Sequence, residues 1–113
     1  MPVQHTEKTS LGLDANLAAA LSYLLGFVSG IIVLVLEKDN RFVRFHALQS
    51  VLAFGGITLL WVLLNAVPIL GFLLGVLIII PGSAVVWLVM MFKAYQGDEF
   101  KLPIVGPIAA ERL

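Results

Sequence analysis

Three long apolar runs without a charged residue constrain this chain more than any other feature. The first covers residues 15–36 and the third covers residues 69–92, and a second lies between them at about residues 47–67. A helix of 22 residues extends about 33 Å, enough to cross the hydrocarbon core of a bilayer. Hydrophobic residues make up 60% of the 113 and charged residues 12%. A soluble fold this small could not bury so much apolar surface.

The sequence therefore predicts an all-α membrane protein, a bundle of three transmembrane helices at about residues 15–36, 41–67 and 69–95. Asp14 is a candidate N-cap for the first helix, Asp39 or Asn40 for the second, and Gly97 has the C′ position after the third. The second helix is amphipathic at its start, over residues 41–50. The third is expected to kink near Pro81, with two half-helices in a re-entrant hairpin as the alternative.

The distribution of basic residues predicts a topology. Six of the seven basic residues flank the first turn or follow the third helix, and the turn near Pro68 has none. By the positive-inside rule, residues 1–13 form a flexible tail outside the cell. Residues 98–113 then form a cytoplasmic tail that docks on the membrane face. Residues 15–36 are too long for a signal peptide and lack a small-residue cleavage site, so they are expected to be retained. A prokaryotic plasma membrane is the expected location.

Small residues recur at four-residue spacing on two of the helices. Such residues let helix backbones approach closely in lipid. They predict packing within the monomer, with homodimerisation or docking on a partner helix as alternatives. The residues are Ala18, Ser22, Gly26 and Gly30 on the first helix and Gly71 and Gly75 on the third.

Polar residues gather at the start of the second helix and after the third. Arg41 and Arg44 could hold a lipid phosphate or a partner's carboxylate, or simply anchor the topology. Gln49 and Ser50 lie a turn deeper and are expected to hydrogen-bond another helix. A metal or haem role for His46 is not expected, because the other histidine, His5, should lie across the membrane. The candidate partner- or headgroup-binding residues are Arg41, Arg44, His46, Gln49, Ser50, Tyr95 and Lys101.

Several function classes lack the residues that they need. The chain has no cysteine, which removes thiolate chemistry and sulfur-ligated metals. Residues 51–92 contain no Asp, Glu, Lys or Arg, which argues against a proton-coupled transporter. No catalytic triad, paired carboxylates or phosphate-binding glycine loop is present, and no basic face for nucleic acid. We therefore expect no enzyme activity, no cofactor and no nucleic-acid partner.

Two stretches carry a family resemblance. Residues 41–50, RFVRFHALQS, directly follow LEKDN, and residues 93–106 read KAYQGDEFKLPIVG. Together they resemble a bacterial and archaeal family of small membrane proteins of unknown function. That family is similar to the membrane domain of a chloroplast inner-envelope protein-import translocon component. The resemblance implies a role beside a transporter or translocon. On the predicted topology both motifs face the cytoplasm, so we expect them to pack together there, with the tail against the start of the second helix. The chloroplast relative has four spans, one more than expected here. The positions carried over are Arg44, Phe45, His46, Gln49, Ser50, Tyr95, Gly97, Lys101 and Pro103.

Three hypotheses for function follow. The first is a non-enzymatic helical module that assembles with itself or with a larger transport or translocation complex in the lipid bilayer. The second is a homo-oligomeric pore or carrier for a small solute or ion, lined by Ser22, Ser29, Thr58 and Ser83. The third is a lipid-binding or membrane-shaping protein that uses Arg41, Arg44 and the apolar tail.

Overall fold

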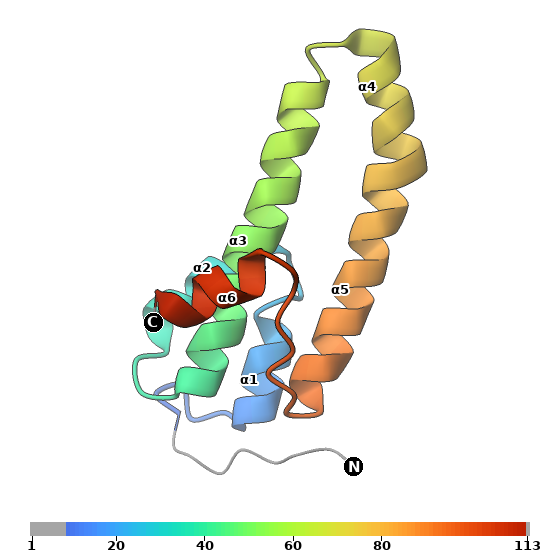
Figure 1. Cartoon of the computed structure of the whole chain (residues 1–113). Helices are drawn as coiled ribbons and strands as arrows, with labels where there is room; N and C mark the ends of the chain where they lie inside the picture. The colour runs from blue at the N-terminus through green and yellow to red at the C-terminus, as the bar shows by residue number, and fades with distance from the viewer. Residues whose placement is uncertain (1–8, 113) are drawn as a thin grey trace.

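A computed structural model describes residues 9–112 of the chain, and these contain helices and no strand. The helices are α1 (Ala15–Leu21), α2 (Phe27–Leu36), α3 (Arg41–Leu64), α4 (Pro68–Leu74), a π-helical turn η1 (Gly75–Ile79), α5 (Ile80–Tyr95) and α6 (Val105–Glu111). Figure 1 shows a long antiparallel pair, α3 beside α4–η1–α5, with α1, α2 and α6 gathered around the lower half of α3.

Two helices, not three, are long and apolar enough to cross a membrane. They are α3, with 24 residues, and the continuous helix Pro68–Tyr95, with 28 residues. The predicted first span is wrong, because residues 15–36 form two short helices, α1 and α2, with a turn between them. The break lies at Gly26, whose φ of 64° is unfavourable for residues with a side chain.

The α1–α2 pair is a helical hairpin whose two ends meet. The backbone N–H of Ser10 donates to both carboxylate oxygens of Glu37, at 2.9 and 2.8 Å, so the chain before α1 lies beside the residue after α2. The described part of the predicted outer tail, residues 9–13, therefore lies at the same end of the molecule as the segment after α5. The expectation of opposite sides is corrected to this extent, and residues 1–8 lie outside the described residues.

Polar side chains satisfy the backbone carbonyls at the turn between α1 and α2. A backbone group left without a partner in hydrocarbon would cost several kcal/mol. At the tip of the hairpin, the hydroxyls of Ser50 and Ser29 donate to the Gly26 carbonyl, at 2.9 and 3.2 Å. The Trp87 indole N–H donates to the Leu24 carbonyl at 3.1 Å. The turn is thus satisfied by one side chain of its own run, Ser29, and by two from other helices, Ser50 of α3 and Trp87 of α5.

The helix Pro68–Tyr95 continues through Pro81 without a break. The π-helical turn Gly75–Ile79 directly precedes the proline, at the place where a kink was predicted. Proline has no N–H to donate to the preceding turn, and a π-helical turn is one way in which a helix accommodates such a change in pairing. The alternative of a re-entrant hairpin at Pro81 is wrong, because the helix is continuous there; the run that is divided by a turn is the first one.

Two other expected helix boundaries are confirmed. Asn40 caps α3, since its side-chain oxygen accepts from the Val43 N–H at 3.1 Å. Gly97 follows α5 with a φ of 85°, and its N–H donates to the Ala94 carbonyl.

Candidate functional site

The densest group of buried polar side chains lies where α1–α2, α3 and the segment after α5 meet. We call this region the polar end; it comprises residues 9–23, 37–50 and 93–103. The opposite end, the turn at Asn65–Val67 and helix α4, is called the narrow end. At the polar end, Tyr23, His46 and Gln49 are all fully buried, in contact with one another.

The partners of these three side chains fix the direction of each hydrogen bond. His46 Nε2 lies 2.9 Å from the Asp98 carbonyl, so it carries the proton and donates. His46 Nδ1 then accepts from the Tyr23 hydroxyl at 2.7 Å. Gln49 Nε2 donates both to the Tyr23 oxygen at 2.9 Å and to the Phe100 carbonyl at 3.0 Å. The neutral imidazole with its proton on Nε2 gives every donor in this chain of bonds an acceptor.

Gln49 also accepts a hydrogen bond from the backbone of the segment after α5. Its Oε1 lies 2.8 Å from the Leu102 N–H, so one side-chain amide pairs with the backbone on both sides of Lys101. The expectation that the tail packs against the start of α3 is confirmed by these bonds. Ser50, expected to bond another helix, donates to the hairpin tip at Gly26.

Glu37 forms a second buried centre on the other side of α3. Burial raises the pKa of its carboxyl, but backbone N–H groups of Ser10, Asn40, Asp39 and Leu11 donate to it, and the net pKa lies below the ordinary value. The carboxylate therefore holds together the entry to α1 and the turn before α3.

The two arginines differ in how available their guanidinium groups are to a headgroup or a partner. Arg44 donates to the carbonyls of Leu34 and Glu37, at 3.1 and 2.6 Å, and so caps the C-terminus of α2. Arg41 is 59% exposed at its side chain and pairs with Glu99 at 2.7 Å. A headgroup or partner carboxylate would find Arg41 at the surface, whereas Arg44 is committed to the fold.

The remaining predicted binding residues lie near this cluster without joining it. Tyr95 is 58% exposed, and its carbonyl accepts from the buried Asn16 amide at 3.0 Å. Lys101 is exposed, and its backbone lies close against Gly106 of α6.

The small-residue ribbons pack inside the chain. A Cβ at Gly30 would lie 2.9 Å from the Ala47 carbonyl, and one at Gly26 would contact Phe54. Gly71 abuts the Leu64 carbonyl and Gly75 abuts the Trp61 ring, while Ala18 and Ser22 are fully buried. Both GxxxG pairs are thus occupied by intramolecular contacts, which favours the monomer-packing interpretation over a dimer interface at these residues.

Sequence reasoning missed Tyr23, Glu37, Asn16 and Trp87 as organising residues. Tyr23 and Asn16 are residues with polar side chains inside a run that was predicted as one span. Their polarity was the only sign in the sequence that this run makes internal hydrogen bonds. Glu37 appeared only as part of the LEKDN segment and was given no role. Its position three residues before Asn40 allows its carboxylate to accept from the Asn40 N–H.

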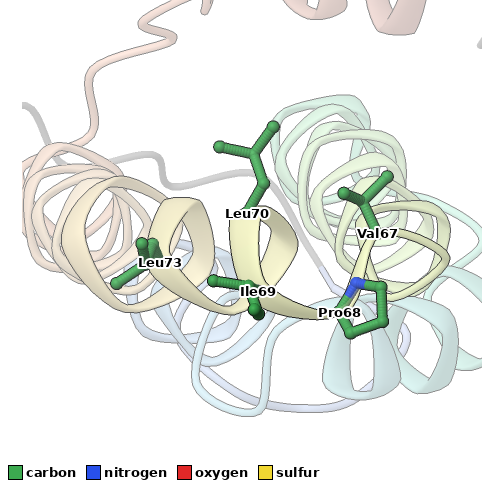
Figure 2. Close-up of a pocket in the computed structure, with 5 residues that line it drawn as sticks. All are labelled: Val67, Pro68, Ile69, Leu70 and Leu73. Atoms are coloured by element: carbon green, nitrogen blue, oxygen red, sulfur yellow. The ribbon is translucent and has the colours of Figure 1, made fainter.

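The narrow end offers no comparable group. An apolar hollow of about 450 Å³ lies at the turn, lined by Val67, Pro68, Ile69, Leu70 and Leu73 (Figure 2). A second cavity, of about 330 Å³, lies between α3 and α5 and is lined by Ile57, Thr58, Trp61, Ile79, Ile80 and Ser83. Neither contains a titratable side chain. Within residues 9–112, no three His, Asp or Glu side chains are grouped as metal ligands.

These features define a class, a small helical membrane protein with two candidate spans and a short helical hairpin held by a buried polar cluster. The chain belongs to the family described as the magnetosome magnetite crystal formation protein family (MamF/MmsF), whose model matches residues 7–109.

Curated relatives agree with this class. The chain is 46% identical over 104 residues to a UPF0132 membrane protein of Methanocaldococcus jannaschii, covering 92% of this chain and 93% of the relative. It is 45% identical over 101 residues to a UPF0132 membrane protein of Archaeoglobus fulgidus, covering 89% and 97%. No solved structure matches. The predicted family of small membrane proteins is confirmed, and the similarity to a chloroplast translocon component is not shown by these relatives.

Proposed function

We propose that the chain is a non-enzymatic integral membrane module that acts by assembling with a larger membrane complex, as an accessory to transport or translocation. The observation that carries the proposal is that the polar groups are used inside the fold, whereas the exposed surface is apolar. Within residues 9–112, every buried side-chain nitrogen and oxygen has a hydrogen-bond partner. The tail and the hairpin supply most of the partners of the central residues, so these polar groups serve the fold.

The exposed surface is apolar and lies along the long helix pair. In the most apolar stretch of Pro68–Tyr95, only 11% of residues are buried inside the chain. Val85, Leu88 and Phe92 form one outward face of α5, each about 60% exposed (61, 60 and 60%). Lipid covers such a face, and other helices can pack on it through van der Waals contact.

The basic residues support an orientation for this module. Lys38, Arg41, Arg44, Lys93, Lys101 and Arg112 all lie at the polar end or in α6 beside it, and the narrow end has no charge. By the positive-inside rule the polar end faces the cytoplasm of a prokaryotic cell. Because the chain lacks cysteine, single-cysteine variants at Lys38 and Ala66 can test this with an impermeant maleimide in intact cells. Labelling of Lys38→Cys from outside would contradict the orientation.

The assembly itself is tested by native mass spectrometry of the protein extracted gently from its own membranes. A stoichiometric complex with a transporter or translocon subunit supports the proposal, and the partner's identity then specifies the function. Crosslinking from Leu88→Cys, with Lys38→Cys as the matched control away from the apolar face, locates the contact. A monomer that yields no crosslink from Leu88→Cys would contradict the proposal.

A homo-oligomeric pore or carrier is the second candidate. The observation that favours it is the cavity between α3 and α5, where Thr58 and Ser83 bring hydroxyl groups to an otherwise apolar wall. Several copies would be needed to enclose a path. A conductance in planar bilayers that is lost in Ser83→Leu would support this function, and no conductance at any protein density would count against it.

The family description connects its members with magnetite crystals. A role at a mineral-bearing membrane is compatible with a module that assembles other components there. The maleimide experiment also tests this role, because it shows on which side of the membrane the polar end lies.

A further inference from the structure

The two halves of the molecule differ in cross-section in the plane of the proposed membrane. Figure 1 shows α1, α2, α3, α5 and α6 side by side in the lower half, and only α3 with α4–η1 in the upper half. The molecule extends 49 Å along its longest axis and 28 by 22 Å across it. The extra elements all lie at the polar end, because the hairpin and the tail both start there.

The hairpin reaches about half of the hydrocarbon thickness. Helix α2 has 10 residues, which extend about 15 Å, against about 36 Å for the 24 residues of α3. Its tip is fixed at this depth, since Gly26 contacts Ser50 and Phe54, nine and thirteen residues into α3. In a bilayer core of about 30 Å, the hairpin is therefore confined to one leaflet.

Residues 98–102 of the tail lie in the same leaflet as the hairpin. Asp98 is bonded to His46, and Phe100 and Leu102 are bonded to Gln49, one turn higher on α3. Extended backbone tolerates lipid depth only when its polar groups are satisfied, and Gln49 satisfies two of them. Ile104 follows, 78% exposed, with a positive φ of 68° that is strained for a β-branched residue. α6 then lies across α3 (Figure 1), with Ile108 also exposed.

We propose that the chain is a leaflet-selective wedge that prefers membranes in which the leaflet around the polar end is convex. A helix with side chains is about 10 Å wide, so the hairpin alone displaces on the order of 150–200 Å² more lipid area in one leaflet than in the other. The ligand is the curved lipid surface itself. With the polar end in the cytoplasm, the preferred membrane is one that invaginates into the cell, or an internal vesicle. This inference rests on the proposed membrane insertion.

The test compares orientation in vesicles of two sizes. Single-cysteine variants Lys38→Cys at the polar end and Ala66→Cys at the narrow end are reconstituted with phosphatidylcholine and phosphatidylglycerol, in sonicated small vesicles and in large extruded ones. Only the small vesicles have a strongly convex outer leaflet. We expect impermeant maleimide to label Lys38→Cys about twofold or more above Ala66→Cys in small vesicles, and equally in large ones.

A matched pair of substitutions tests whether Ile104, the residue before α6, belongs to the wedge. Ile104 and Ile69 are the same residue type and equally exposed, at 78%, but lie beside the polar end and at the narrow end respectively. Asparagine tolerates positive φ, so Ile104→Asn removes the apolar side chain without adding strain. We expect Ile104→Asn to reduce the orientation bias and Ile69→Asn to preserve it.

The outcomes separate the wedge from the membrane insertion on which it depends. If the two cysteines lie on opposite sides of the bilayer but the labelling ratio is the same at both vesicle sizes, the wedge is refuted and the membrane-spanning proposal stands. If both cysteines are labelled together in every vesicle, the chain does not span and both proposals fail. A bias unaffected by Ile104→Asn overturns the assignment of Ile104 to the wedge.

Discussion

The polar end and the narrow end are built from similar helices but are held together by different forces. At the polar end, buried side chains such as Gln49 and Glu37 bond directly to backbone groups of distant segments. At the narrow end, Gly71 lets two helices touch, as does Gly75 one turn further along, and the polar side chain of Asn65 bonds within its own helix. Because lipid gives no hydrophobic drive between helices, the first end relies on hydrogen bonds and the second on close packing.

The largest test of this contrast is Gln49→Leu. The substitution leaves the Phe100 carbonyl and the Leu102 N–H without their partner and takes one donor from Tyr23. Each buried group left unsatisfied costs about 1–3 kcal/mol, so we expect a loss of about 3–5 kcal/mol in the free energy of unfolding. Denaturation by dodecyl sulfate in mixed micelles measures it. Release of the tail should also appear as fast amide exchange at Leu102, and slow exchange there would contradict the role assigned to Gln49.

The next test concerns close packing at the narrow end. A Cβ at Gly71 would overlap the Leu64 carbonyl, a backbone atom that cannot rotate away, whereas a Cβ at Gly82 meets nothing within 4 Å. We expect Gly71→Ala to destabilise the protein by about 1–3 kcal/mol, as overpacking does. Gly82→Ala should be neutral or stabilising, because alanine favours helix over glycine. Equal effects of the two substitutions on the unfolding midpoint would argue that the helices do not touch there.

The contrast also explains what could be predicted from the sequence. The helical membrane class, the cap at Asn40 and the docking of the tail near Gln49 followed from local patterns of charge, apolar residues and turn residues. The long apolar helices depend only on periodicity and length, and these are visible in a single sequence.

The α1–α2 hairpin could not be predicted because its signal is non-local. Residues 15–36 pass every test of length and apolarity for a span. The turn is stable only because Ser50 and Trp87, from two other helices, satisfy backbone carbonyls at its tip. The Glu37 centre is hidden for the same reason, since its donors include Ser10, 27 residues away.

Acidification should loosen the Glu37 centre. The pKa of Glu37 is lower in the folded protein than its ordinary value of 4.5, so its contribution to stability is complete above that value. The contribution is lost as the pH falls through the folded pKa. We expect the amides of Ser10 and Asn40 to lose protection in this acidic range, relative to amides in the middle of α3, by hydrogen exchange.

The control for this pH dependence is Glu37→Gln. The neutral amide has one acceptor oxygen in place of two, so Ser10 and Asn40 should be less protected at neutral pH. Their protection should then be indifferent to acid over the same interval. Acid-sensitive protection that persists in Glu37→Gln would assign the titration to another group.

The smallest expected effect completes the comparison between the two ends. Asn65 carries a side-chain amide like that of Gln49, but it is exposed and donates to the Trp61 carbonyl of its own helix at 2.9 Å. Asn65→Leu removes one local bond and leaves no distant segment without a partner, so we expect a change within about 0.5 kcal/mol in the free energy of unfolding. The measurement is the same denaturation by dodecyl sulfate used for Gln49→Leu. A cost similar to that of Gln49→Leu would show that the turn at Asn65–Val67 depends on side-chain hydrogen bonds as much as the polar end does, and the distinction between the two ends would then fail.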